Sequence, residues 1–522
     1  MSFTSLPFFF LLAIAVAFYY LLPMRRRWWC LLAVSYIFYA FAGAWCLFFI
    51  LYTTAVTYVT SMLLRRMSRR EAACLAGELA EAPKEERKAY KKTQKKKRFR
   101  LLVAGLLFGM GMLAVIKYTA FTVTTVNSLG ASIKVPSLLL PMGISFYTFQ
   151  SMGYLIDVYR ERAEVERHPL RLALFVSFFP QLLQGPISRF SDLAPQLIEG
   201  HRFNGLRFRA GTVRILWGYF QKLVIADTAM IAVKTLTEGK MEGAYTLLLI
   251  LLYSAVIYGD FKGGIDITIG VAELFGITLK ENFNRPFSSK SVKEYWNRWH
   301  ITMGSWFTDY VFYPLSLCKP MQSFSKWSRA HLGAAVGKRL PVYVATIVTW
   351  FLTGLWHGAG WNFIVWGLLN CALILISQEL EPLWSAWRKA APRVVESRWW
   401  GIWQATRTFL LMGLIRSLDC YRDVPLTFAL WGSILTRFGL RELLSGGFLQ
   451  LGLAVGDWCV LAVGILITFT VSRLGKTQCL RERIAKRPVL YCAVMTFGAV
   501  AILIFGTYGV GYDASNFIYG QF

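Results

Sequence analysis

Acidic side chains are scarce in this sequence. It has 29 Asp and Glu against 57 Lys and Arg, a net charge of +28, and only 16% of its 522 residues are charged. In a soluble protein this excess would suggest nucleic-acid binding, but the basic residues are concentrated in short loops between apolar runs, which is the positive-inside pattern of membrane proteins. With 56% hydrophobic residues, a soluble fold would have to bury several apolar runs of roughly 20 residues in one core, so we exclude it.

Cysteine is also infrequent. The nine cysteines are scattered, with no CxxC pair and no Cys/His cluster, so the sequence predicts neither a disulfide framework nor a metal site. A cleavable signal peptide is missing as well, because residues 3–23 are long enough to cross the membrane and no small-residue cleavage site precedes the next apolar run. We therefore expect residues 3–23 to be a transmembrane segment.

Basic residues set the predicted topology of the N-terminal region. The arginines at 25–27 should hold the end of the first span in the cytoplasm and leave the N-terminus outside. Residues 28–64 are too long for one crossing and predict an out-and-back hairpin that turns near Gly43. Residues 65–100 hold 14 Lys or Arg against 5 acidic residues and predict a cytoplasmic loop, helical or disordered. Contact with anionic lipid or with a cofactor phosphate is the functional alternative for this loop.

The remaining apolar runs predict an all-α, polytopic membrane bundle of about 10–12 spanning helices in a single domain, residues 1–522. Further spans are expected at residues 101–126, 138–160, 211–237, 245–278, 340–377, 401–416, 426–437, 447–472 and 489–511. The runs 172–185 and 301–318 are too short to span and have basic residues on both sides, so we expect re-entrant segments. Irregular backbone at membrane depth needs protein or a water-filled cavity around it, which predicts a central cavity. The tail, residues 512–522, should emerge outside.

The chain appears organised around residues 282–370, which contain two histidines in apolar and aromatic surroundings. His357 lies in the apolar run 340–377, about 25 Å along a helix that starts at the cytoplasmic face of a core about 30 Å thick. His300 lies in an aromatic cluster nearer that face. A histidine in hydrocarbon is costly and usually serves transport or chemistry, although a hydrogen bond to a neighbouring helix is the simpler alternative.

Six sequence blocks resemble the membrane-bound O-acyltransferases, most closely the bacterial branch that O-acetylates alginate and other cell-surface polysaccharides. The blocks are LPMGISFYTFQSMGYLIDVYR, FPQLLQGPISRFSDLAPQL, YGDFKGGIDITIG, EYWNRWHITMGSWFTDYVFYPL, GLWHGAGWNFIVWG and the terminal FIYGQF. One departure is local, because DFKGGID has Lys262 and Gly264 where the family has serine and tyrosine. This difference can alter the lining of a cavity or the choice of acceptor.

The resemblance implies that His357 is the catalytic histidine and His300 the second histidine of the family. A neutral imidazole in a cavity of low dielectric can take the proton of a hydroxyl that attacks an acyl carbonyl. The terminal motif suggests that Tyr519 is an acyl acceptor, which passes the acyl group to an extracellular partner of the SGNH-hydrolase type. If Tyr519 is not an acyl acceptor, the tail only fills the extracellular opening of the cavity, or the acyl group is transferred directly to the polymer.

Further residues are candidates for binding the donor, which the resemblance implies is acetyl-CoA or another acyl thioester, without a metal. Asn297, Arg298, Asp309 and Asn362 are candidates to orient the histidines or polarise the carbonyl, and a helix-to-helix hydrogen bond is the alternative for each. Lys293 belongs to the basic loop 280–298. The cations of this loop and of the basic loop 319–339 suit the phosphates of CoA. Asp260 and Asp266 are expected to pair with arginines for structure.

The expected function is therefore an O-acyltransferase of the bacterial cytoplasmic membrane, which moves acetyl from a cytoplasmic thioester toward an extracellular polysaccharide such as alginate. D-alanyl transfer to teichoic acid is the alternative within the family. From another class, a transporter or flippase would use His357 as a proton relay. A transporter favours an internal repeat, and the sequence has none that we can detect.

Overall fold

The computed structural model describes residues 2–475, 479–509, 512 and 517, and it confirms an all-α fold. The chain forms two compact units, residues 1–211 with 271–279 and residues 212–270 with 280–522. Across the described residues, seven helices are long and apolar enough to cross a membrane. They are Cys46–Ala76, Lys84–Ser128, Ala244–Leu274, Lys319–His357, Trp361–Glu379, Val455–Leu474 and Pro488–Phe505, and the shorter apolar helices are Leu6–Leu21 and Val424–Thr436.

The first unit begins with a helical hairpin followed by a longer one. Its helices are α1 (Leu6–Leu21), η1 (Met24–Arg26), α2 (Arg27–Ala40), α3 (Cys46–Ala76), α4 (Lys84–Ser128), α5 (Ile144–Tyr159), α6 (Pro169–Ser177), α7 (Phe179–Leu183) and α8 (Phe190–Glu199). The predicted turn near Gly43 is confirmed: α2 and α3 are joined there, and Gly43 has φ +128°, which a residue with a side chain rarely adopts.

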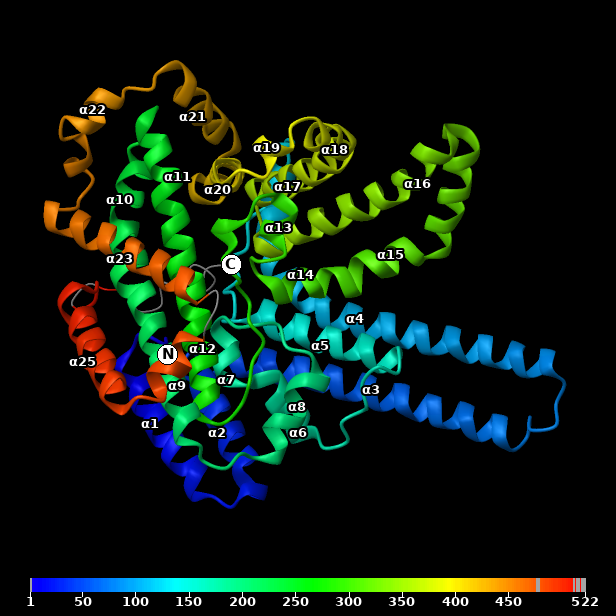
Figure 1. Ribbon diagram of the computed structural model, residues 1–522. Helices are drawn as coiled ribbons and strands as arrows, with labels where there is room; N and C mark the ends of the chain where they lie inside the picture. The colour runs from blue at the N-terminus through cyan, green and yellow to red at the C-terminus, as the bar shows by residue number, and fades with distance from the viewer. Residues whose placement is uncertain (1, 476–478, 510–511, 513–516, 518–522) are drawn as a thin grey trace. The chain divides into compact units, whose positions relative to one another are not determined.

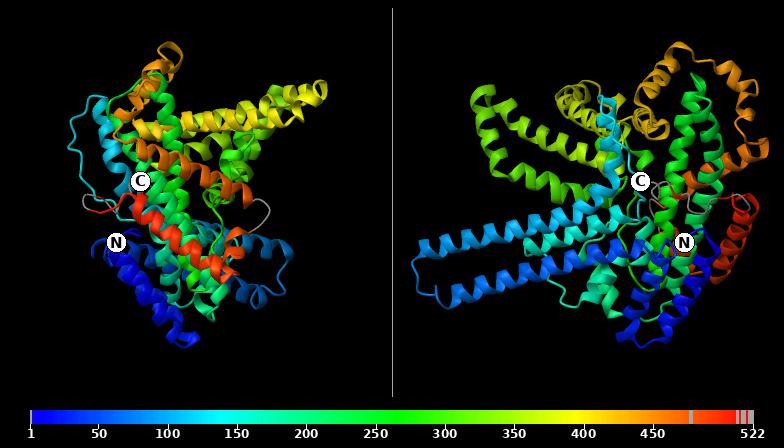
Figure 2. Two further views of the ribbon diagram at one scale, coloured as in Figure 1. Left: turned by 60° about the vertical axis from the view of Figure 1, so that its left-hand side comes forward. Right: turned by 180° about the vertical axis from the view of Figure 1, so that it is seen from behind.

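The basic region 65–100 is almost entirely helical. It forms the C-terminal part of α3 and the N-terminal part of α4, which lie side by side in Figure 1 and in the view from behind in Figure 2. Arg98 on α4 joins the two helices because it contacts the Glu71 carboxylate at 3.2 Å and the Ser68 hydroxyl at 2.8 Å. Of the two predicted states, helical and disordered, the structure has the first.

Two predicted short runs are divided into short helices. Residues 172–185 form most of α6 and α7, and every residue from 172 to 185 is buried. Residues 301–318 form α14 (Ile301–Phe307), the π-helical segment η5 (Thr308–Phe312) and α15 (Tyr313–Leu317). None of these pieces is long enough to cross a membrane by itself.

The second unit contains two neighbouring helices that are each interrupted by a π-helical segment. One is α9 (Gly205–Tyr219), η2 (Phe220–Ala226) and α10 (Asp227–Glu238), and the other is α11 (Ala244–Ile257), η3 (Tyr258–Lys262) and α12 (Gly263–Leu274). The segments η2 and η3 pack against each other. Lys222 on η2 forms a buried ion pair with Asp260 on η3, with Nζ 2.5 Å from Oδ1.

The remaining helices of this unit complete the bundle around residues 282–370. They are η4 (Pro286–Ser288), α13 (Val292–Trp296), α16 (Lys319–His357), α17 (Trp361–Glu379), α18 (Glu381–Ala390), α19 (Pro392–Val395), α20 (Arg398–Tyr421), α21 (Val424–Thr436), α22 (Leu440–Leu444), η6 (Gly447–Gln450), α23 (Val455–Leu474), α24 (Leu480–Ala485) and α25 (Pro488–Phe505). Residues 319–339, which we expected to form a basic loop, are helical and belong to α16. This helix bends at Gly333, where φ is +80° (Figure 1).

Candidate active site

His357 is the last residue of α16, and glycines determine how closely this helix approaches α17. A Cβ atom added to Gly354 would lie 2.4 Å from the Phe363 carbonyl oxygen, and one added to Gly367 would lie 2.5 Å from the Trp350 carbonyl oxygen. The two backbones therefore touch where a larger residue would hold them apart. Residues 358–360 then break the run 340–377 and join the two helices.

The His357 side chain lies in an aromatic pocket and is 8% exposed. Its ring centroid is 4.6 Å from that of Trp366 on α17, and 5.0 Å from that of Trp356 in an edge arrangement. Trp366 is held by a small network, since Asn370 Nδ2 donates to the Trp366 carbonyl at 2.8 Å while Asn370 Oδ1 accepts from Trp296 Nε1 at 3.2 Å. The imidazole of His357 thus has apolar neighbours, and the Trp366 ring beside it is held in place by Asn370.

His300 is fully buried and stands at the N-terminus of α14 with φ 49° and ψ 50°. This left-handed conformation is uncommon for a residue with a side chain and is retained where the surroundings enforce it. Asn282 is the neighbour that does so. Its carbonyl accepts from the Ile301 amide at 3.0 Å, and its side-chain amide nitrogen lies 3.2 Å from His300 Nδ1.

Asn282 is the hydrogen-bond partner of His300 Nδ1. Its Oδ1 atom accepts from the Thr302 amide at 3.0 Å and from the Thr302 hydroxyl at 2.9 Å. Both polar atoms of the Asn282 side chain reach His300 Nδ1, Nδ2 at 3.2 Å and Oδ1 at 3.3 Å, so these contacts fit either tautomer of the ring. Burial lowers the pKa of His300 to about 3, so the ring is neutral at pH 7.

One indole ring contacts both histidines. The Trp356 ring centroid is 5.6 Å from that of His300 and 5.0 Å from that of His357, and the ring centroid of Phe261 on η3 is 4.8 Å from that of His300. The structure therefore brings together the two histidines that the sequence singled out. Both belong to one aromatic cluster that contains Trp356.

A buried arginine supports the segment that carries His300. Arg416 on α20 donates to the Tyr295 hydroxyl at 2.7 Å, and its guanidinium carbon lies 3.9 Å from the ring centroid of Trp299, which stacks on Tyr295. Such a cation over an indole face is favourable, more so away from water. Arg416 thereby fixes the residue directly before His300.

The predicted donor-binding residues lie in mixed surroundings. Arg298 is half-buried and paired with Glu294 at 2.6 Å, while Lys293 and Asn297 are exposed. Asp309 lies in the π-helical segment η5 and is half-buried. Asn362 donates to the Leu418 carbonyl at 3.3 Å, the kind of helix-to-helix contact named as its alternative role.

Asp260 and Asp266, which we expected to form structural ion pairs, both do so. Asp266 is bound by Arg214, whose Nε is 3.0 Å from Oδ1, whereas the partner of Asp260 is Lys222 rather than an arginine. Lys222 also binds Asp227 at 2.8 Å. In the part of the chain that the structure describes, no three His, Cys, Asp or Glu side chains are grouped to hold a metal ion.

Tyr519 lies outside the described residues, but two residues of its tail do not. The Phe517 side chain is fully buried, with its ring centroid 4.6 Å from Lys222 Nζ, and the Tyr512 hydroxyl donates to Asp227 Oδ2 at 2.9 Å. These two residues therefore pack against η2 and the start of α10, which agrees with a tail that folds back onto the protein.

The sequence of the chain can now be compared with known proteins. Residues 160–414 match the sequence profile of the membrane-bound O-acyltransferase (MBOAT) family. This range is an MBOAT domain. Both His300 and His357 lie inside the matched range, and the family predicted from the six sequence blocks is confirmed. With its seven apolar helices, this MBOAT protein is a multi-pass membrane protein.

Several bacterial relatives are similar over about half of the chain. The probable alginate O-acetylase AlgI of Azotobacter vinelandii is 35% identical over 308 residues, 58% of this chain and 57% of the relative. The peptidoglycan O-acetyltransferase of Helicobacter pylori is 33% identical over 303 residues, 52% of this chain and 53% of the relative. The teichoic acid D-alanyltransferase of Bacillus subtilis is 29% identical over 281 residues, 52% of this chain and 67% of the relative. The chain thus spans little more than half the length of the first two.

Proposed function

We propose that the chain is a membrane O-acyltransferase that takes an acyl group from a cytoplasmic thioester and delivers it toward an extracellular polysaccharide, with acetyl as the acyl group. The observation that carries the proposal is the pair of buried histidines that both contact Trp356, inside the range that matches the MBOAT family. The relatives named as alginate and peptidoglycan O-acetylating proteins support acetyl and a cell-surface polymer. The bacterial cytoplasmic membrane is the location that suits both substrates.

In this proposal His357 is the general base. Its imidazole takes the proton of the attacking hydroxyl as the oxygen bonds to the thioester carbonyl carbon, and it returns the proton to the thiol as the carbon–sulfur bond breaks. Positioned proton transfer of this kind accelerates a reaction roughly 10²- to 10⁴-fold. The aromatic side chains of Trp356 and Trp366 shield the imidazole from water, which strengthens each hydrogen bond around the reacting atoms.

His300 has a different task in this proposal, because its pKa is too low for it to act as a base or as an imidazolium at pH 7. We assign its ring proton to Nε2, with Nδ1 accepting from Asn282 Nδ2. A neutral Nε2–H is a hydrogen-bond donor, suited to the carbonyl oxygen of the donor thioester as negative charge develops there. The cations of the 280–298 loop are the proposed contacts for the phosphates of acetyl-CoA or of a carrier-protein thioester.

The first test is thioester hydrolysis by the purified protein in detergent, with acetyl-CoA as the probe. We expect His357→Ala to lose hydrolysis while keeping its size-exclusion profile and melting temperature, and His300→Ala to be impaired as well. Wild-type hydrolysis in both variants would refute the assignment. Absence of hydrolysis in the wild type, together with proton-coupled uptake of a solute into vesicles, would favour the transporter class instead.

We further propose that Tyr519 receives the acyl group. Its phenol, with an ordinary pKa near 10, needs an adjacent base, and the resulting phenyl ester is activated enough to pass the acyl group to an SGNH-type partner, which acylates the polymer. Burial of Phe517 two residues earlier supports a tail that reaches into the protein. Tyr519→Phe keeps the ring and removes the nucleophile.

Two measurements test this relay. Intact-mass spectrometry of the wild type with donor should show an acyl adduct on the C-terminal peptide, and Tyr519→Phe should abolish polymer acetylation in cells. A normal rate of acetylation in that variant would establish direct transfer. The similarity to teichoic acid D-alanyltransferases supports D-alanyl as a second acyl group, and competition between acetyl and D-alanyl thioesters in the hydrolysis assay decides between the two.

A further inference from the structure

The unit formed by residues 212–270 and 280–522 contains a cavity that has no part in the proposed acyl transfer. Its volume is about 640 Å³, and its walls are mainly apolar side chains of α9, α23 and α25. The principal apolar lining residues are Leu216, Ile467, Val471, Val494, Phe497 and Ala501. Neither histidine lines it. Cavities of roughly 300–1,000 Å³ hold small organic ligands, so this one has room for an acyl chain with part of a polar head.

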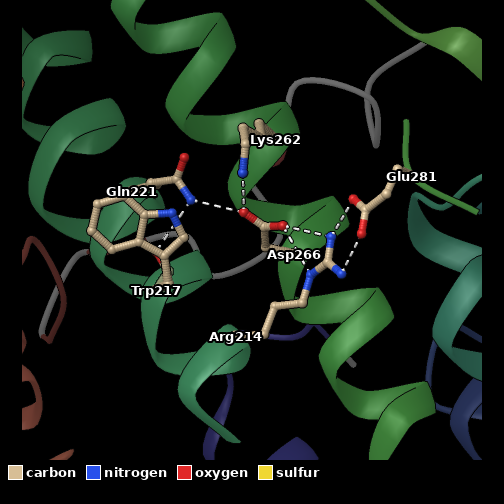
Figure 3. Close-up of polar contacts among 6 residues, drawn as sticks. All are labelled: Arg214, Trp217, Gln221, Lys262, Asp266 and Glu281. Carbon is tan, nitrogen blue, oxygen red and sulfur yellow. Dashed lines mark hydrogen bonds and ion pairs between the residues drawn. The ribbon is translucent and has the colours of Figure 1, made fainter. Parts of the chain in front are cut away.

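Charged side chains also line this cavity, among them Arg214, Lys262, Asp266 and Glu281. Figure 3 shows the polar contacts among them. The Asp266 carboxylate is bound by Arg214 through Oδ1, and by Gln221 and Lys262 through Oδ2. The Arg214 guanidinium also holds both carboxylate oxygens of Glu281, at 2.7 and 2.6 Å. These hydrogen bonds engage the guanidinium on two sides, and the Arg214 side chain is only 7% exposed.

Lys262 is the more accessible cation of this network, since its side chain is 20% exposed. Within the network, two cations, Arg214 and Lys262, balance two anions, Asp266 and Glu281. Arg481 on α24 lines the same cavity and adds one positive charge to the lining. The cavity therefore combines long apolar walls with a polar end of net positive charge.

The helices that form the outer wall have mostly exposed surfaces. Only 11% of the apolar window of α23 and 6% of that of α25 is buried inside the protein. Because both helices are long and apolar enough to span, their remaining surface faces lipid. The charged end lies beside the segment from Arg473 to Arg487, which is rich in basic residues and which the positive-inside rule assigns to the cytoplasmic face.

We propose that this cavity binds one anionic phospholipid of the cytoplasmic leaflet. Its phosphate would lie against Lys262 and Arg481, and one acyl chain would run along α23 and α25. Basic pockets between transmembrane helices on the cytoplasmic side are the usual sites for acidic head groups, and each cation near such a surface favours an anionic lipid. A zwitterionic lipid offers the same chain and no net charge, so the charged end should discriminate against it.

The test is native mass spectrometry of the full-length protein, delipidated in detergent and titrated with dioleoylphosphatidylglycerol or dioleoylphosphatidylcholine. We expect the wild type to retain one phosphatidylglycerol about tenfold more strongly than phosphatidylcholine. Lys262→Gln and Arg481→Gln should each reduce that preference without removing the chain-dependent binding. Arg481→Gln is tested as well as Lys262→Gln, because Lys262→Gln also removes a partner of the buried Asp266 and could affect folding.

Two tryptophan substitutions on α25 test whether the apolar walls of the cavity bind the lipid. Val494→Trp fills the cavity and should abolish retention of either lipid, whereas Val500→Trp, on the same helix but outside the lining, should bind as the wild type does. Equal melting temperatures of these two variants would show that the loss is local. Three results would overturn the proposal: equal retention of the two lipids by the wild type, unchanged binding in Val494→Trp, or displacement of the lipid by inorganic phosphate alone.

Discussion

At His300, one neighbour, Asn282, contacts the ring nitrogen Nδ1. The Asn282 side chain is oriented by two hydrogen bonds from Thr302, and in the proposed mechanism its Nδ2 donates to His300 Nδ1. The donor on Nε2, which the proposed mechanism uses, thus depends on an asparagine that does not touch the substrate. Asn282 is a positioning residue in this view.

We predict that Asn282→Asp lowers thioester hydrolysis at pH 7 by at least about tenfold, which corresponds to one hydrogen bond to a charged centre. The new carboxylate accepts from Nδ1–H, so the neutral ring loses its proton on Nε2, and the pKa of His300 rises. On acidification the imidazolium regains Nε2–H. The ratio of variant to wild-type rate should therefore increase between about pH 8 and about pH 6.

Asn284→Asp is the matched control, because Asn284 is exposed in the same loop and the substitution adds the same charge. Its rate ratio should stay near one at every pH. A flat ratio for Asn282→Asp, or an equal loss in both variants, would contradict the tautomer assignment.

The site residues that the sequence missed are those whose partners are distant along the chain. His300 and His357 were found because an imidazole in an apolar run is chemically conspicuous. Asn282 and Arg416 carry no such signal, since an asparagine in a basic loop and an arginine at the end of a predicted span look solvated. Their roles become visible only when folding buries them against His300, Tyr295 and Trp299.

At the scale of helices, the contact between α16 and α17 determines the position of His357. Gly354 lies one turn before His357, and its backbone touches the Phe363 carbonyl. We predict that Gly354→Ala destabilises the protein by about 1–3 kcal/mol, since a backbone atom at 2.4 Å cannot move aside without separating the helices. Thioester hydrolysis should fall with it, because the His357 ring shifts relative to Trp366.

Gly432→Ala is the control, because nothing lies within 4 Å of a Cβ at that helical glycine. Alanine there should raise stability by up to about 1 kcal/mol through helix propensity. Melting curves in detergent, with activity measured in parallel, compare the two. If Gly354→Ala has the same melting temperature as Gly432→Ala and keeps full activity, the close contact between α16 and α17 does not position His357.

Helix boundaries were predictable where a turn signal and a charge pattern agreed, as at Gly43. They were not where charge suggested a loop. Residues 319–339 are helical on both sides of Gly333, because lysine and arginine are good helix formers, and two helices meet in a kink at Gly333.

For the whole chain, the distribution of basic residues predicts which segments face the cytoplasm. Cys479 is exposed and lies in the basic segment between α23 and α25, whereas Ser132 is exposed in the loop after α4, which should face outward. In a background without other cysteines, Cys479 should react with a membrane-impermeant maleimide only after permeabilisation. Ser132→Cys should react in intact spheroplasts. The reverse pattern would invert the topology.

The paired π-helical segments η2 and η3 have a consequence for how this sequence can change over time. Each holds extra backbone beyond the α-helical repeat and takes it up within one turn, so deleting one residue there would restore a regular helix and leave the flanking turns facing as before. The segments themselves carry Lys222 and Asp260, whose buried ion pair joins them. A deletion in either segment should therefore disturb this ion pair and leave the orientation of the helices beyond it unchanged.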